Sequence, residues 1–491
     1  MGIPQIMRET AKRKTGQAGL LLIAFYIFLA FLAPYITSHD PIRDLNLASN
    51  LAMPEWVAAF PGYSDLPRNT VYNFNASNCS IEGYRDELYE VLFKKASSAV
   101  SILIYYKGNT SIETQGPKIL AIVRCSFNYD YRPPNMFVLT VQFNYSFADP
   151  MNRYKLSIIL STGLKEYTLY DTGYLSRDSL SRWQNPLLIS SNSPQIKELN
   201  NIPLRENTAQ IMLSSKGLYS VELRIMSMPL NGTSTSPLQS STKISQEARV
   251  DLGRIILTVP GLLYGILGTN HVGADVWSQF VWGARQSILV GLIASSVSVA
   301  LGIVFGILLG YAGRYSRELL VFLVDTIYLI PLLPILLITL VVVGRNIYIT
   351  SIIIGMFLWA GLARELGNWI LSLKERPYVE AAQALGASKL YILLRHVIPF
   401  TVHLLLFGFI IRIPFSILLE AGLSILSFGD PFQPSWGKMI SEALAGGALI
   451  SGAWWWIIPP VLGLSTLSLG FVYLGYVLDD ILNPRLREQK S

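Results

Sequence analysis

Charged side chains are scarce in this chain. Asp, Glu, Lys and Arg make up 14% of its 491 residues, whereas hydrophobic residues make up 51%. Soluble domains carry about 25% charged residues, so this composition argues against an ordinary soluble protein and indicates a membrane protein. The net charge of +7 would suit a nucleic-acid partner. The basic residues flank apolar runs, however, as topology signals do, so we expect no nucleic-acid partner.

Two kinds of site also leave no trace in the sequence. The four histidines, His39, His271, His396 and His403, are scattered without the spacing of metal ligands, so we expect no metal site. No G-x4-G-K-[ST] motif occurs, so the chain has no P-loop with which to bind ATP. We therefore expect neither a cofactor nor enzymatic activity in this chain.

Six apolar runs are each long enough to cross a membrane, which takes about 20 helical residues. They cover residues 18–36, 287–309, 319–343, 347–370, 400–426 and 454–478. Arg8, Lys12, Arg13 and Lys14 precede the first run and place the N-terminus in the cytoplasm by the positive-inside rule. Six spans then return the C-terminus to the cytoplasm, which predicts a multi-pass protein of the cell membrane.

The first run has a second interpretation as a signal peptide, because it follows a basic start. Its apolar stretch is too long for a typical signal sequence, and Pro34 follows Ala33, the best small-residue cleavage site. We therefore expect residues 1–36 to remain as a cytoplasmic N-terminus and a first transmembrane helix.

Residues 37–265 separate the first two spans, and the predicted topology places them outside the cell. Asn, Ser, Tyr and Pro replace the long Leu and Ile runs there. Apolar and polar residues alternate, as in half-buried strands, in segments 99–106, 119–129, 138–147 and 217–225. A segment of more than 200 residues can bury an adequate core. We expect a β-rich extracytoplasmic domain inserted between helices 1 and 2.

Cysteine is nearly absent, and its two copies, Cys79 and Cys125, both fall in this insert. A pair of cysteines on the oxidising side of a membrane favours a disulfide, which would stabilise the fold by about 2–4 kcal/mol. Two buried free thiols are the alternative.

Five N-x-[ST] sequons also lie in the insert, at Asn75, Asn78, Asn109, Asn144 and Asn231. Roughly three would occur by chance in a segment so rich in Asn, Ser and Thr, so the motif is a weak signal of a glycoprotein. Asn78 is the weakest acceptor, because Cys79 occupies the middle position of its sequon. Glycans on this insert would suggest an archaeal cell surface.

Segment 377–388 lies in a loop that the predicted topology makes cytoplasmic, yet its pattern is helical. Pro377 suits a first helical position, where no backbone N–H is needed. Gly386 suits the left-handed residue that ends a helix, and Ser388 can cap the next one. The small side chains of Ala381 and Ala382 would let a partner's surface approach this helix closely.

The sequence of this segment, E-A-A-x3-G followed by an apolar residue and proline, resembles the EAA loop of importer-type ABC permeases. In that family the loop is the coupling helix that docks into a separate ATPase subunit. The resemblance assigns ATPase coupling to Tyr378, Val379, Glu380, Ala381, Ala382, Leu385, Gly386, Ala387, Ser388 and Pro399. The alternative is an ordinary Ala-rich cytoplasmic helix with a glycine stop.

Further stretches are similar to the dipeptide/oligopeptide permease family, and specifically to its C-type subunit. They are L-G-T-N-H-V-G-A-D-V-W-S at 267–278, G-A-R-Q-S at 283–287, L-E-A-G-L-S-I-L-S-F-G at 419–429, P-S-W-G-K-M at 434–439 and D-D-I-L-N-P-R-L-R at 479–487. The chain departs from the family at Asn270 and Asn483, which replace acids, and at Ala274, which replaces a basic residue. The large insert is the main departure.

The resemblance implies a membrane all-α protein with the six transmembrane helices of the type I ABC importer permease fold, in which residues 266–491 form a five-helix core. It also implies that the chain forms half of a translocation pathway. The implied partners are a second homologous permease subunit, two ABC ATPase subunits that bind ATP and Mg, and an extracytoplasmic substrate-binding protein.

The family favours short peptides as cargo, and oligosaccharides are the alternative. An ion-coupled secondary transporter and a single-span surface receptor are alternatives of another class. Neither would need a loop that docks an ATPase.

Charged residues lie within the predicted spans, among them Asp325, Arg412 and Glu420. A charge is costly there and usually faces protein or a water-filled cavity. These residues either line the translocation path or tie helices together. The second interpretation is favoured, because buried polar groups are normally paired inside bundles.

Overall fold

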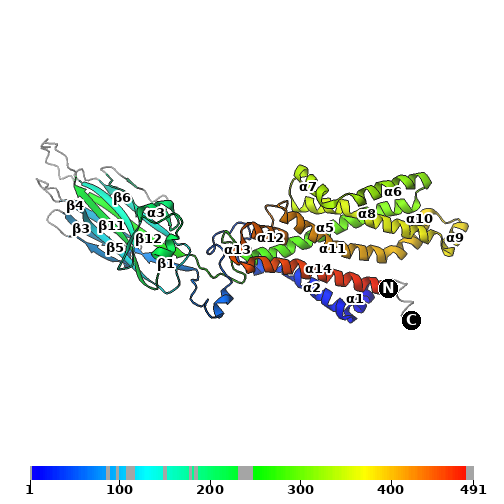
Figure 1. Cartoon of the computed structure of the whole chain (residues 1–491), viewed down its shortest axis with the longest axis horizontal. Coiled ribbons are helices and arrows are strands. Elements are labelled where there is room, and N and C mark those ends of the chain that lie inside the picture. The colour runs from blue at the N-terminus through cyan, green and yellow to red at the C-terminus, as the bar shows by residue number, and fades with distance from the viewer. Residues whose placement is uncertain are drawn as a thin grey trace. The chain divides into compact units, whose positions relative to one another are not determined.

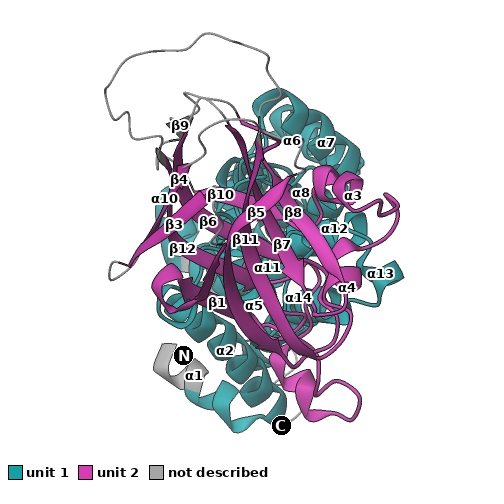
Figure 2. Cartoon of the chain, turned by 90° about the vertical axis from the view of Figure 1, so that its left-hand side faces the viewer, with its two compact units in different colours: residues 1–46, 265–491 teal, residues 47–264 magenta. Residues whose placement is uncertain are grey.

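The computed structural model describes residues 3–84, 89–95, 99–106, 117–147, 152–175, 180–181, 186–229 and 247–482. The chain divides into two units, which Figure 2 colours separately. Unit 1 comprises Met1–Asn46 and Gly265–Ser491, and its secondary structure is helical. Unit 2 comprises Leu47–Tyr264 and is rich in β-strands.

Unit 1 is a bundle of long apolar helices joined by short ones (Figure 1). Its elements are α1 (Ile3–Lys12), α2 (Lys14–Ile36), α5 (Val276–Tyr311), α6 (Arg314–Leu329), α7 (Leu332–Val343), α8 (Ile347–Lys374), α9 (Pro377–Ala384), α10 (Lys389–Ile392), a π-helix (Leu393–Val397), α11 (Ile398–Ile425), α12 (Trp436–Ala445), α13 (Ala448–Ser451) and α14 (Trp454–Leu482). Among the described residues, five helices are long and apolar enough to cross a membrane, namely α2, α5, α8, α11 and α14.

The predicted single span over 319–343 is two helices in the structure. Helices α6 and α7 are bent by 86° relative to each other at Ile330 and Pro331. Pro331 cannot donate a backbone hydrogen bond, and it drives the residue before it out of the helical region. Ile330 accordingly has a ψ of 130°. If this bent pair counts as one crossing, the described residues contain up to six.

Small residues let α5 and α8 pack closely. Gly302, Gly306 and Gly310 follow one face of α5 at intervals of four residues. A Cβ added at Gly306 would lie 2.8 Å from the Cβ of Leu366 on α8, closer than side chains normally approach. Glycines at this spacing drive helix association in lipid, where no hydrophobic effect favours it.

Unit 2 contains two antiparallel sheets. The first has the order β10-β6-β12-β4-β3, with β1 also pairing with β12 and β9 with β6, and the second has the order β2-β5-β11-β7-β8. Their bounds are β1 Thr70–Asn75, β2 Ser80–Gly83, β3 Tyr89–Lys95, β4 Val100–Tyr106, β5 Lys118–Tyr129, β6 Val138–Phe147, β7 Asn152–Ser161, β8 Glu166–Asp171, β9 Leu180–Ser181, β10 Leu187–Ser190, β11 Gly217–Pro229 and β12 Glu247–Val259. The four predicted strand segments all form strands.

The two sheets of unit 2 share one hydrophobic core. Ile102 and Leu257 come from the first sheet, and Val123 and Leu223 come from the second; all four are almost completely buried. The alternation of apolar and polar residues along these strands is therefore the signature of a β-sandwich, in which one face of each sheet is buried.

Cys79 and Cys125 form a disulfide, which joins the residue before β2 to strand β5 of the same sheet. Of the predicted glycosylation sites, Asn75 and Asn78 are exposed, whereas Asn144 is half-buried in β6. Asn109 and Asn231 lie outside the described residues.

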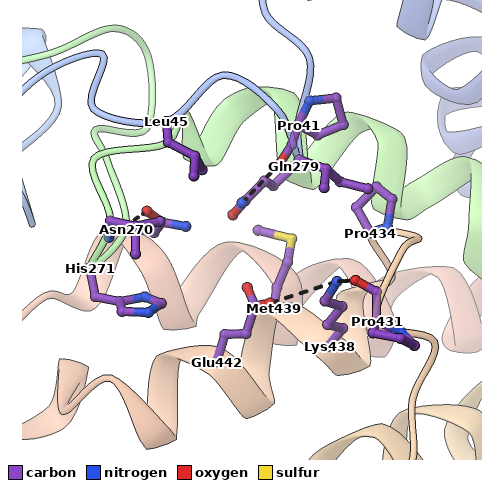
Figure 3. Close-up of a pocket in the computed structure, with 12 residues that line it drawn as sticks. Pro41, Leu45, Asn270, His271, Gln279, Pro431, Pro434, Lys438, Met439 and Glu442 are labelled. Carbon is purple, nitrogen blue, oxygen red and sulfur yellow. Dashed lines mark hydrogen bonds and ion pairs between the residues drawn. The ribbon is translucent and has the colours of Figure 1, made fainter.

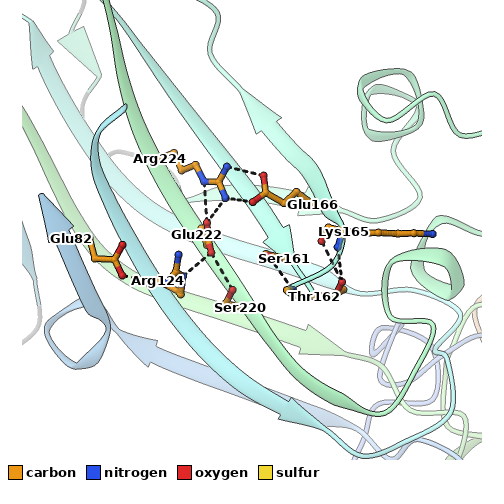
Figure 4. Close-up of polar contacts among 10 residues, drawn as sticks. Glu82, Arg124, Ser161, Thr162, Lys165, Glu166, Ser220, Glu222 and Arg224 are labelled. Atoms are coloured by element: carbon orange, nitrogen blue, oxygen red, sulfur yellow. Dashed lines mark hydrogen bonds and ion pairs between the residues drawn. The ribbon is translucent and has the colours of Figure 1, made fainter. Parts of the chain in front are cut away.

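A polar network crosses the second sheet of unit 2 (Figure 4). Glu222 on β11 is 2% exposed. Its carboxylate accepts hydrogen bonds from Arg124 Nε (2.7 Å) and from Arg224 Nε (2.9 Å). Arg224 also donates to both carboxylate oxygens of Glu166. Burial alone would raise the pKa of Glu222, but the hydrogen bonds from the two arginines outweigh it and leave that pKa below its usual value.

Candidate functional site: the α9 helix and the cavity between the spans

Helix α9 has the start and stop that the sequence predicts. Pro377 occupies its first turn, and Glu380 lies in the same turn, where a carboxylate complements the helix dipole. Gly386 has a φ of +87°, a left-handed conformation that glycine adopts without steric cost. Ser388 Oγ then accepts a hydrogen bond from the Tyr391 N–H (3.2 Å) and caps α10. The chain therefore reverses sharply between two short helices.

One side chain anchors α9 to the bundle. Val379 is completely buried, in a cluster with Leu366, Ile370 and Leu373 of α8 and with Ile392 of α10. Ala382 and Ala387 are half-buried against the same cluster. Val379 therefore contacts the chain's own core and is not available to a partner.

The other residues assigned to coupling are exposed. Leu385 is the extreme case, with 90% of its surface exposed at the end of α9 although it is apolar. The remaining members are Tyr378, Glu380, Ala381, Gly386 and Ser388, together with Pro399 in the first turn of α11. We call this set, with Leu385, the α9 surface. In Figure 1, α9 lies at one end of the helix bundle and α12 and α13 lie at the opposite end.

A cavity of about 690 Å³ lies between the long helices of unit 1. Its walls come from α6, α7, α8, α11 and α14, and most of the lining is apolar. The polar side chains that line it are Tyr328, Glu365, Arg412 and Ser468. Arg412 Nη1 donates to the Gly408 carbonyl oxygen (3.0 Å), one turn earlier on α11.

Asp325, Arg412 and Glu420, the charged residues that the sequence analysis names within the spans, have different surroundings. Asp325 Oδ1 lies 3.0 Å from Arg364 Nη1, so this ion pair ties α6 to α8. Glu420 accepts hydrogen bonds from Ser424 Oγ (2.7 Å) and from Ser435 Oγ (2.8 Å), and Ser435 begins α12. The Asp325 ion pair thus joins two helices, and the hydrogen bonds of Glu420 join α11 to the start of α12. Arg412 differs, because its guanidinium lines the cavity.

Glu365 was missed at the sequence level. It lies inside the predicted span 347–370, and an acid within an apolar run is itself a signal of function. The neighbouring Arg364 is a second charged residue in that run, and in the structure it pairs with Asp325.

A smaller cavity of about 290 Å³ lies near α12 (Figure 3). Gln279 Nε2 donates to the Pro41 carbonyl oxygen (3.1 Å), and Lys438 Nζ donates to that of Pro431 (2.5 Å). Burial raises the pKa of the Glu442 carboxyl in this cavity. Within the described ranges, no cluster of three or more His, Cys, Asp or Glu side chains forms a metal site.

One family model matches a stretch of the helical part of the chain. Residues 302–488 match the family described as "Binding-protein-dependent transport system inner membrane component". A dipeptide transport system permease protein of Bacillus subtilis is 29% identical over 222 residues, which are 45% of this chain and 68% of that protein. A putative peptide permease protein of Brucella suis is 32% identical over 220 residues, 44% of this chain and 72% of that protein.

An oligopeptide transport system permease protein of Haemophilus influenzae is 32% identical over 226 residues, which are 46% of this chain and 71% of that protein. Among solved structures, that of an infectious bursal disease virus strain covers 40% of this chain and 34% of its own at 12% identity, with a TM-score of 0.18. That similarity is too low to support an argument. The extent of the permease matches shows that this multi-pass membrane chain belongs to the family of inner-membrane components of binding-protein-dependent transport systems, as an ABC peptide permease with the type I permease fold.

Proposed function

We propose that this chain forms half of the translocation pathway of an ATP-driven importer of short peptides. In this proposal a second, homologous permease supplies the other half, and a substrate-binding protein delivers the cargo from outside. Two separate ATPase subunits bind ATP and Mg and dock onto the α9 surface. The names of the matched permeases, which refer to dipeptide, oligopeptide and peptide transport, support peptides as the cargo.

The observation that carries this proposal is the division of α9 into an anchored side and an exposed side. Val379 fixes α9 against α8, while Leu385 and Glu380 remain exposed for a partner. The cluster around Val379 also includes Leu404 and Leu405 of α11. A force applied to the α9 surface therefore reaches two spans directly. ATP-driven closure of the ATPase pair would rock these spans as rigid bodies.

We further propose six transmembrane crossings, with the bent pair α6 and α7 as the third. Both termini and α9 are then cytoplasmic, and residues 37–265 are an extracytoplasmic domain inserted after the first span. The Cys79–Cys125 disulfide supports an oxidising environment for this domain. Asn75, which is exposed, is the best placed acceptor for a glycan. Intact-mass measurement of the native protein would reveal any sugar.

The coupling role is tested by Glu380→Lys in the complete transporter, reconstituted in proteoliposomes with its binding protein. We expect peptide uptake to fall while ATP hydrolysis continues, because the reversed charge disrupts docking at the α9 surface. Glu318→Lys is the matched control, since Glu318 is exposed on α6 and pairs only loosely with Arg314 at 3.6 Å. Unchanged uptake by the Glu380 variant would refute the coupling role. Uptake that requires an ion gradient and no ATP would favour a secondary transporter.

A further inference from the structure

We propose that the cavity between α6, α8, α11 and α14 binds the zwitterionic backbone of a short peptide. Arg412 takes the terminal carboxylate, and Glu365 takes the terminal ammonium group. This inference rests on the proposed function and adds to it a specific recognition of peptides inside the membrane, by the permease itself.

Arg412 presents an unused part of its guanidinium to the cavity. Nη1 donates to the Gly408 carbonyl oxygen (3.0 Å), and Nε lies 3.5 Å from the Leu358 carbonyl oxygen. A guanidinium has five N–H donors, so most of its donors are left over. Within the described residues, no carboxylate forms an ion pair with it. A planar fork of this kind binds a carboxylate through two parallel hydrogen bonds.

Two glycines position the guanidinium. A Cβ added at Gly408 would lie 3.1 Å from Arg412 Nη1, so an alanine there would push the guanidinium away. A Cβ added at Gly361 on α8 would lie 3.9 Å from Nη2. The guanidinium therefore lies between α11 and the backbone of α8, beside Gly361.

Glu365 follows Gly361 by four residues on α8, which places it one turn, about 6 Å, further along the helix. It lines the same cavity and is exposed. The adjacent Arg364 pairs with Asp325. In the described part of the chain the Glu365 carboxylate forms no ion pair, although it attracts the Arg412 guanidinium electrostatically. The cavity thus offers one cation and one anion about one helical turn apart. Two extended residues span about 7 Å, so a dipeptide can reach both.

The rest of the cavity suits peptide side chains of varied kinds. Its apolar walls, which can contact side chains of many kinds, come from Phe357, Phe407, Phe415 and Leu418. The volume of about 690 Å³ lies within the usual 300–1,000 Å³ of ligand pockets. A neutral oligosaccharide needs many hydrogen-bond partners, and besides the two charges this lining offers only Tyr328 and Ser468. Low polarity around the two charges strengthens their attraction for peptide termini.

The experiment uses the complete transporter in proteoliposomes and binding protein saturated with the dipeptide Ala-Ala. Uptake and ATP hydrolysis are measured together, and kcat is separated from KM for the loaded binding protein. We expect Arg412→Gln and Glu365→Gln to lower the kcat of uptake by roughly tenfold or more, because each leaves a peptide charge unpaired. ATP hydrolysis stimulated by the loaded binding protein should stay within about twofold, since neither residue belongs to the α9 surface.

Three further variants distinguish recognition from damage to the fold. Gly408→Ala should reproduce the loss by displacing the guanidinium, and Arg412→Lys should restore part of the uptake by keeping the charge. Glu318→Gln removes an exposed carboxylate from α6, outside the cavity lining, and should leave uptake nearly unchanged.

Uptake within twofold of the unaltered protein in both Gln variants would overturn the inference and leave the proposed function intact. An equal loss in Glu318→Gln, or a parallel loss of stimulated ATP hydrolysis, would also overturn it, since either result indicates a structural defect. If the unaltered transporter takes up a neutral oligosaccharide but no Ala-Ala, both the inference and the proposed peptide cargo fail.

Discussion

Replacing Val379 with alanine should loosen α9 from the bundle without altering the α9 surface. Val379 is fully buried beneath that surface, in the cluster that joins α9 to α8, α10 and α11. The substitution removes two methyl groups, each worth about 0.8 kcal/mol, and leaves a small cavity. We expect α9 to lose about 2 kcal/mol of docking energy, so that its undocked population rises roughly 30-fold.

Hydrogen–deuterium exchange of the amides in segment 377–388, measured on the complete transporter in lipid nanodiscs, detects this change. The amides of a short helix exchange when the helix opens locally. Their protection factors should therefore fall by roughly the same 30-fold. Peptide uptake per ATP hydrolysed should fall with it, because an undocked helix transmits no force to the spans.

Leu385→Ala is the matched control. Leu385 is 90% exposed, so its truncation removes no contact between α9 and the bundle. Amide exchange in segment 377–388 should therefore change much less than in the Val379 variant, even though contact with the ATPase weakens. Equal protection in the Val379 variant and the unaltered protein would refute the idea that this one side chain anchors α9.

The remaining predictions concern the stability of the two units. Gly306→Leu should separate α5 from α8 and lower the melting temperature in detergent, whereas Gly313→Ala, where an added Cβ meets nothing within 4 Å, should not. Replacing Cys79 and Cys125 by serine should destabilise unit 2 by about 2–4 kcal/mol, measured by denaturant unfolding. The pKa of Glu222 is lower in the folded state than its ordinary value, so its contribution to stability is present at neutral pH and is lost as the pH falls through the folded-state pKa. Melting of unit 2, followed from pH 6 to pH 2, should therefore show a loss that Glu222→Gln reduces; an unchanged pH profile would contradict this.

Several features could be predicted because they depend on short stretches of chain. Pro377, Gly386 and Ser388 each restrict or cap the backbone locally, and the structure has the predicted start, stop and cap. Four strands of unit 2 were predicted from alternation alone, since a half-buried strand needs only its own residues to show which face is apolar.

Other features escaped prediction because they depend on how helices pack. The apolar run over 319–343 is continuous and so does not predict an 86° bend, although Pro331 lies where the bend occurs. Val379 appeared to belong with its exposed neighbours, because the coupling motif assigns the whole segment one role. Its burial depends on side chains of α8 and α10.

Hydropathy and turn chemistry determined that this chain crosses a membrane several times, carries a β-rich insert and turns sharply at α9, because each of these follows from interactions within a few successive residues. Only the tertiary structure decided which charges are neutralised. Arg364 pairs with Asp325 across two helices, so Glu365 is left to share a cavity with Arg412, which lies 47 positions further along the chain. Helix packing sets those neighbours, and no local pattern in the sequence encodes it.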